Sequence, residues 1–495
     1  MSKMKLLVIC LTLFALPVSI TAQRNASKSQ TQTPALFRVI NVSEGLAPES
    51  RTSIAAVKEA EIVFDRPAAE YARAARIDIP LLDGRVFRAE RTYAETRALD
   101  DHSWFGKAKI GEYEGDITLT FKGGYVAGRI FTFEKTYEIV PKGNKHILME
   151  LDGSLFPECA GEVKGDPGYI RETPGATVDS GDRIDVLVVY TSSVRTSLGG
   201  DAQAQTFAQQ AIDASNGTYF NSKIRQRLRL VGAQLTALNE TGSFSSELSN
   251  LRNDAATATL RNTTNADMVA MLTNSTEACG IGYLMGAPGG NPNNGFSVTA
   301  RTCAVGNLTF AHELGHNMGS QHNPENGSGP TYPYSYGHWH NGMYRTVMSY
   351  VNPCTSGCNR APYFSNPDII YAGLPTGIAD ARDNARSINN TADWIANYRY
   401  SGSNLMLSNM NGGGVMRRMA NQTLSWTSDN ITGNVRIELS RDGGTSWETV
   451  SASTPNDGSE AIRVFGKPTQ QGRIRIVSLN NTIISDSSVN NFRIQ

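Results

Sequence analysis

Three histidines in one short stretch constrain this chain of 495 residues more than any other feature. His312 and His316 are four residues apart, so on a helix their imidazoles share one face and can reach one metal ion. Glu313 lies on a neighbouring side of the same turn, close enough to handle a water without being a ligand. Gly319 can adopt a positive φ, which would let the chain leave the helix sharply and bring in His322 as a third ligand. Three nitrogens and an open fourth position are typical of a catalytic zinc site, whereas structural sites fill all four positions.

A methionine after this motif supports the same interpretation. The pattern His-Glu-x-x-His-x-x-Gly-x-x-His resembles that of the metzincin zinc endopeptidases, and Met348 in Thr-Val-Met-Ser-Tyr resembles their methionine turn. Within that clan the chain is most similar to the reprolysin (adamalysin) group, as found in secreted bacterial metalloproteases. Two positions depart from the group: Asn323 replaces its usual Asp, and Tyr350 is a feature of astacins and serralysins. The resemblance implies an α/β metzincin catalytic domain with a mixed sheet, an active-site helix and Met348 as a hydrophobic floor beneath the zinc.

The resemblance also assigns roles in the hydrolysis of protein or peptide substrates. Bound Zn²⁺ would lower the pKa of its water toward ~7, and Glu313 would take the proton and deliver it to the leaving amine. Tyr350 would help to stabilise the oxyanion, or is only a packing residue of the turn. The edge strand that pairs with an extended substrate would consist of Gly280, Ile281, Gly282 and Tyr283.

The N-terminus indicates export. Lys3 and Lys5 precede an apolar run over residues 6–20, and a small-residue cleavage site follows, which is the layout of a secretory signal peptide over residues 1–22. The run is shorter than the ~20 residues that span a bilayer, although an N-terminal membrane anchor is the alternative. We therefore expect a secreted, extracellular protein with no membrane span in the mature chain.

Export would leave five cysteines in an oxidising compartment, so that four can pair and one is left over. Cys159 precedes the next cysteine by 120 residues, and we expect it to be the free thiol. Reprolysin-like and matrix-metalloprotease propeptides hold the zinc in a latent state with one cysteine thiolate, and Cys159 is similar to that cysteine; the alternative is an ordinary buried thiol. Two disulfides, with three pairings left open, are expected among Cys279, Cys303, Cys354 and Cys358.

Composition and strand patterns divide the rest of the chain into three regions. Residues 23–180 are predicted to form a β-rich propeptide that ends in a linker, which is dense in Gly, Pro and Asp over 165–182. Residues 181–400 alternate strands with helices and predict the catalytic domain, on a largely parallel sheet. Residues 401–495 carry evenly spaced short strands, which predict an accessory immunoglobulin- or fibronectin-like β-sandwich. The predicted helices of the catalytic domain lie over 201–221, 246–261 and 378–399.

Charge and motifs exclude other classes of protein. The 46 basic and 46 acidic residues balance, which argues against a nucleic-acid binder. A catalytically inactive metzincin-like adhesion protein is the alternative function, but Glu313 and all three ligands are present. Another zinc hydrolase, acting on esters or glycans, is disfavoured by the third histidine and the methionine turn. The accessory domain would bind substrate, a glycan or a cell surface, and several Asp/Asn-rich loops leave calcium binding open.

Overall fold

The structure is a computed structural model that describes residues 33–495 except 46, 48, 49, 167–178, 180, 181, 411, 412, 445, 483 and 489. The predicted signal peptide and most of the predicted linker lie outside the described residues. Among the residues that are described, no helix has the length and apolar character needed to cross a membrane.

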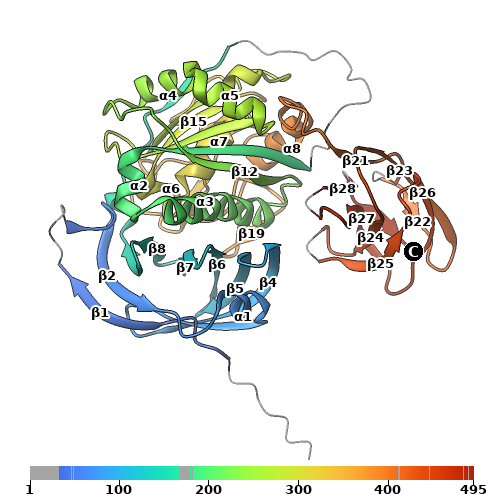
Figure 1. The fold of residues 1–495 in the computed structure, drawn as a ribbon, viewed down its shortest axis with the longest axis horizontal. Helices are drawn as coiled ribbons and strands as arrows, with labels where there is room; N and C mark the ends of the chain where they lie inside the picture. The colour runs from blue at the N-terminus through green and yellow to red at the C-terminus, as the bar shows by residue number, and fades with distance from the viewer. Residues whose placement is uncertain are drawn as a thin grey trace, which may run out of the picture. The chain divides into compact units, whose positions relative to one another are not determined.

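The N-terminal region is an antiparallel sheet of nine strands, which curves into a half-barrel around its own core (Figure 1). Its strand order is β1-β2-β9-β8-β7-β6-β5-β4-β3. Alternation in β6 places Ile117, Leu119 and Phe121 in the core, as expected for a strand with one apolar face. The predicted β-rich character of this region is confirmed. The elements are β1 Arg38–Glu44, β2 Ala56–Val63, α1 Ala68–Arg73, β3 Arg76–Pro80, β4 Val86–Ala98, β5 Asp101–Ile110, β6 Tyr113–Lys122, β7 Tyr125–Phe131, β8 Thr136–Lys142 and β9 Lys145–Leu151.

The central region is built on a six-stranded mixed sheet in the order β10-β14-β15-β13-β11-β12. Strands β11, β12, β13 and β15 run parallel to one another, and β14 runs antiparallel to its neighbour β15. The predicted, largely parallel sheet is confirmed. The edge strand β10 comes from the end of the N-terminal region and pairs parallel to β14. The strands are β10 Glu162–Lys164, β11 Arg183–Tyr190, β12 Arg227–Leu235, β13 Met268–Thr273, β14 Gly280–Leu284 and β15 Phe296–Ala300.

Two predicted helices are wrong in extent, because aspartates cap new helix starts. The helix predicted over 246–261 is two helices, since Asp254 is extended and its carboxylate accepts a first-turn backbone N–H at 2.7 Å. The helix predicted over 378–399 begins only at Asn384, since Asp383 accepts a first-turn N–H at 3.0 Å. The helices are α2 Ser192–Leu198, α3 Asp201–Asn221, α4 Phe244–Asn253, α5 Ala255–Thr263, α6 Arg301–Ala304, α7 Thr309–Asn317 and α8 Asn384–Ile395, with short 3₁₀ turns at Gly153–Leu155 and Pro292–Asn294.

Helix α3 has the predicted bounds, but it is buried on opposite faces. It packs on β12 of the central sheet and on β6, β7 and β8 of the N-terminal sheet. Its apolar residues, such as Phe207, enter the central core, while Asp213 is buried toward the N-terminal sheet. The Asp213 carboxylate accepts hydrogen bonds from Ser103 and Thr120 and lies 3.4 Å from a guanidinium nitrogen of Arg97. Because these polar groups satisfy one another, the N-terminal region docks on the helix without an unpaired buried charge there.

The C-terminal region forms two sheets around one apolar core. One sheet has the order β21-β23-β26, and the other has the order β22-β29-β27-β24-β25 with β28 on β27. Its β character is therefore confirmed. The strands of the C-terminal region are β21 Asn404–Leu407, β22 Val415–Met416, β23 Asn421–Asp429, β24 Val435–Ser440, β25 Glu448–Thr454, β26 Ser459–Arg463, β27 Thr469–Ser478, β28 Ser485–Ser487 and β29 Phe492–Ile494.

The central region also contains short two-residue strands outside its main sheet. They are β16 Trp339–His340, β17 Tyr344–Arg345, β18 Asn359–Arg360, β19 Ile370–Tyr371 and β20 Leu374–Pro375.

The structure contains the two predicted disulfides and the predicted free thiol, and it shows which cysteines are paired. Cys279 is bonded to Cys303, and Cys354 is bonded to Cys358. Cys159 is free and buried. The first disulfide joins the start of β14 to α6, so it closes a loop around β15.

Loop length should decide how much each disulfide stabilises the chain. Replacing Cys279 and Cys303 by Ala should lower the free energy of unfolding by about 3.5 kcal/mol, because loop-closure entropy grows with the number of residues enclosed. Their sequence separation is 24, whereas that of Cys354 and Cys358 is 4. Replacing the second pair should therefore cost less, about 2 kcal/mol. Urea unfolding of the two double variants measures both losses, and equal losses would contradict the loop-length explanation.

Candidate metal centre

The three histidines of the motif converge on one point. Helix α7 carries His312 and His316, and the chain then turns at Gly319, whose φ is 86° as the sequence predicts. The Nε2 atom of His322 lies 3.1 Å from that of His312 and 3.0 Å from that of His316. A side chain at Gly319 would also collide with Thr331, at 2.8 Å from its Oγ1. The turn therefore needs glycine both for its backbone and for space.

Hydrogen bonds orient the rings of His312 and His316, and burial favours the neutral form of all three histidines, which metal ligation requires. Nδ1 of His312 lies 2.9 Å from the carbonyl oxygen of Val347, and Nδ1 of His316 lies 2.9 Å from that of Ser320. A proton on each Nδ1 can be donated to these oxygens, which leaves Nε2 with its lone pair. Burial lowers the pKa of His316 to about 4 and lowers those of His312 and His322 well below their usual range.

The geometry fits a zinc ion. Zn–N bonds of about 2.0–2.1 Å in a tetrahedral site place ligand nitrogens about 3.3 Å apart. The observed separations of 3.0 and 3.1 Å are close to that value. The three histidines would hold the ion and leave its fourth position free.

Glu313 is buried against strand β14. Burial raises its pKa to about 8, and the Cys159 thiol and Arg360 act in the opposite direction. A Cβ added at Gly280 would lie 2.5 Å from Oε1 of Glu313, and one at Gly282 would lie 2.9 Å from its backbone oxygen. The two glycines thus let β14 lie directly on the helix that carries the acid, a reason that the sequence pattern alone did not give.

Two residues of the predicted turn lie beside the histidines. Met348 is fully buried, and its sulfur is 2.7 Å from the position that a Cβ at Gly315 would take. It therefore packs directly under α7, between the two helical histidines. The ring centroid of Tyr350 is 4.2 Å from that of His322, and its hydroxyl donates to the carbonyl oxygen of Cys159 at 3.3 Å.

Cys159 reaches the same place from the N-terminal region. Its sulfur and the ligand atoms of His312 and Glu313 all lie within 4.8 Å of one another. Backbone hydrogen bonds hold the chain on both sides of it: Ala160 donates to Gly280 at 2.9 Å, and Cys279 donates to Glu158 at 3.1 Å. Burial raises the pKa of the Cys159 thiol well above its usual range, and neighbouring Glu313 acts in the same direction. Bound metal would oppose both causes, because a metal stabilises the thiolate.

The segment after Cys159 continues as β10 along β14. Glu162 pairs with Gly282, and Lys164 pairs with Leu284, in a parallel register. The carboxylate of Glu162 lies 3.4 Å from Nδ1 of His322 and accepts a hydrogen bond from Gln321 at 2.9 Å. Sequence reasoning missed Glu162, and no local pattern distinguishes it from other acidic residues in strands.

The chain is similar to metallopeptidases from several bacteria. Residues 180–365 match the family described as "Metallo-peptidase family M12". A peptidyl-Asp metalloendopeptidase of Stenotrophomonas maltophilia (strain R551-3) is 32% identical over 362 residues, which cover 66% of this chain and 83% of the relative. That of Xanthomonas campestris pv. campestris is 30% identical over 405 residues, which cover 76% of this chain and 91% of the relative.

The zinc content of variants should distinguish the three histidine ligands from Glu313, which is not expected to bind the metal. His316→Ala should lower bound zinc from about one ion per chain to far below that, because two nitrogens cannot replace three. Glu313→Gln should keep about one ion, because the carboxylate is not a ligand. Elemental analysis of both variants after gel filtration measures this. Equal zinc loss in the two variants would contradict the assignment.

Proposed function

This chain belongs to metallopeptidase family M12 and is a metalloendopeptidase, and from this premise we propose that it is a secreted zinc enzyme, made as a latent precursor, that cleaves peptide bonds next to aspartate. One observation carries the proposal. The Cys159 sulfur, from the N-terminal region, lies beside the histidine cluster of the central region.

The residues around the metal would divide the work of hydrolysis. Zn²⁺, when bound, would polarise the scissile carbonyl and lower the pKa of a water. Glu313 would accept the proton of that water and release it to the leaving nitrogen. Tyr350 would donate a hydrogen bond to the oxyanion once the Cys159 carbonyl, its present acceptor, has left. Met348 would support the helix from below.

Latency would rest on two contacts of the N-terminal region. The Cys159 sulfur would take the fourth ligand position and exclude the catalytic water. Strand β10 covers β14, whose residues Gly280–Tyr283 would otherwise pair with an extended substrate. Cleavage in the linker over 165–182 would release both contacts.

The substrate preference comes from the relatives. The similar proteins are named peptidyl-Asp metalloendopeptidases, and they match this chain over most of their own length. We therefore assign an aspartate next to the scissile bond to the substrates of this chain as well.

Export and domain organisation complete the proposal. Residues 1–22 would be the signal peptide, 23–180 the propeptide with its linker, 181–400 the catalytic domain, and 401–495 an immunoglobulin- or fibronectin-like sandwich that binds substrate, a glycan or a cell surface. Two disulfides accord with an oxidising compartment.

Removing the proposed switch should activate the full chain. Cys159→Ala should hydrolyse casein about tenfold or more faster than the unprocessed wild type, because nothing then holds the fourth metal position. The double variant Cys159→Ala/Glu313→Gln is the matched control and should be silent. Initial rates and the intact mass of each protein are measured together. Equal rates for the variant and the unprocessed wild type would overturn the role of Cys159 in latency and leave strand β10 as the only proposed block.

The general base is tested in the same full chain. In the Cys159→Ala background, Glu313→Gln should lower kcat by about 10²–10⁴, because a neutral amide cannot accept the proton. Zinc content should stay the same, and a chelator should stop the parent. A variant that keeps both zinc and most of its kcat would show that Glu313 is not the base.

A further inference from the structure

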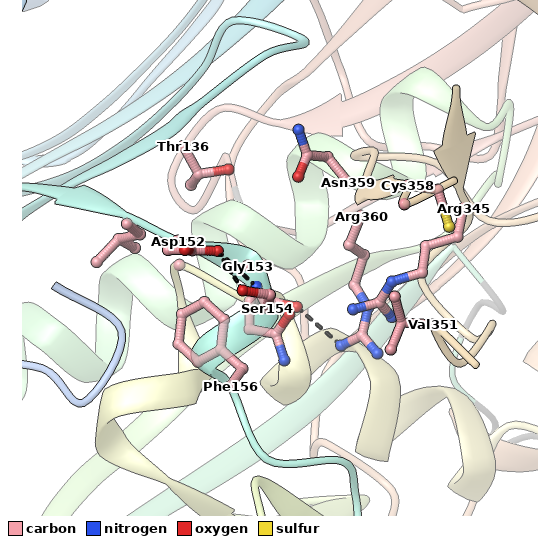
Figure 2. A pocket seen from close by; sticks show the side chains of 14 residues that line it. Thr136, Asp152, Gly153, Ser154, Phe156, Arg345, Val351, Cys358, Asn359 and Arg360 are labelled. Carbon is pink, nitrogen blue, oxygen red and sulfur yellow. Dashed lines mark hydrogen bonds between the residues drawn. The ribbon is translucent and has the colours of Figure 1, made fainter. Parts of the chain in front are cut away.

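A cavity of about 140 Å³ lies between the N-terminal region and residues on both sides of the methionine turn. Its first wall is the end of β9, Ser154 of the following 3₁₀ turn, and Phe156, which comes directly after that turn. Its second wall includes Arg345, Val351 and Arg360 (Figure 2). The cavity thus has one wall that would leave with the propeptide and one that would stay.

The second wall holds two buried arginines. Arg345 is 4% exposed and Arg360 is 6% exposed. Each uses one terminal nitrogen for a backbone carbonyl: Arg345 donates to Ser349 at 2.6 Å, and Arg360 donates to Asn307 at 2.9 Å. Among the described residues, Nε of each arginine has no hydrogen-bond partner, and neither guanidinium is in an ion pair.

Buried like charges without a counter-ion are costly to a folded chain. Burial lowers the pKa of Arg345 to about 9, and the nearby charge of Arg360 lowers it further, while Glu158 opposes both. The Glu158 carboxylate does not pair with Arg345; its Oε1 accepts from the backbone N–H of Val351 at 3.2 Å. The two guanidinium groups therefore lack the anion that such groups usually bind when buried.

The cavity is adjacent to the metal centre. Burial is the largest cause of the raised pKa of Glu313 and of the lowered pKa of His312, and the positive charge of Arg360 lowers both. Along the chain, Phe156 lines the cavity, and Cys159, three residues later, lies at the histidines. An extended peptide in the same cleft therefore brings a side chain to the cavity when its backbone passes the metal.

We propose that Arg345 and Arg360 bind the carboxylate of the substrate aspartate beside the scissile bond, an inference that rests on the proposed endopeptidase function. Two guanidinium groups can offer several N–H donors to one carboxylate, and a neutral asparagine side chain of the same size cannot replace that charge. The first wall covers the cavity in the precursor and places Glu158 near Arg345. Release of the propeptide then opens the site to substrate.

The test compares two peptides that differ only in Asp or Asn at one position. The wild type and Arg360→Gln are made as full chains and activated by limited proteolysis in residues 165–182. In the wild type, kcat/KM for the Asp peptide should exceed that for the Asn peptide about 100-fold, and Arg360→Gln should abolish most of this ratio. Arg360→Lys keeps a positive charge but loses the planar fork, so its ratio should be intermediate.

The controls distinguish a variant that has lost only the recognition of aspartate from a variant that no longer folds or binds zinc. Arg386→Gln on α8 removes an arginine that is half exposed and paired with Asp380, and it should keep the wild-type ratio. Zinc content and the unfolding midpoint identify a variant that does not fold; Arg345→Lys then replaces it, with the intermediate ratio that is expected of Arg360→Lys. If the folded arginine variants keep the wild-type ratio, the proposal that Arg345 and Arg360 bind the substrate aspartate is overturned, while the proposed endopeptidase function is unaffected. A wild type that cleaves casein without preferring Asp overturns the pocket and the substrate assignment. A wild type that cleaves nothing after activation overturns both proposals.

Discussion

The convergence of three imidazole nitrogens, with Nε2 of His322 within 3.1 Å of the other two, is the constraint on which the central region depends. Helix α7 can supply only two of them, so the chain must turn at once at Gly319 and return. The same crowding demands small residues above and below the helix. Gly315 admits the sulfur of Met348 from below, and Gly280 admits β14 directly against Glu313. A larger side chain at either glycine would push an element away from the metal centre.

One stretch of the N-terminal region closes three parts of the cleft at once. Between residues 152 and 164 it lines the arginine cavity, brings a thiol to the histidines and adds a strand to β14. Two of these contacts would use a group that is otherwise left unsatisfied, namely an open metal position and a free sheet edge, whereas the arginines of the cavity stay without an anion. Because the contacts are consecutive along the chain, a single cut in the predicted linker would release all of them in the precursor that we propose.

Elements with strong local patterns were predictable. The helix over 201–221 appears with its predicted bounds, and the alternation of strands and helices that is predicted from residue 181 onward forms the largely parallel sheet. The errors lie at Asp254 and Asp383, where one carboxylate caps a new helix inside a longer apolar periodicity. The apolar periodicity indicates which face of a helix is buried, whereas the residue at which a helix starts depends on single capping hydrogen bonds. At these two aspartates the periodicity therefore continues although a new helix begins.

The sequence by itself determined the metal motif, the acid beside it, the free Cys159 and the number of disulfides, because these depend on spacing within one helix or on counting thiols. Only the tertiary structure decided the pairing of Cys279 with Cys303, the approach of Cys159 to the histidines and the meeting of Arg345 with Arg360. Backbone geometry fixes distances between residues a few positions apart. Groups that are tens to hundreds of residues apart meet only through the packing of whole sheets and helices, on which local spacing carries no information.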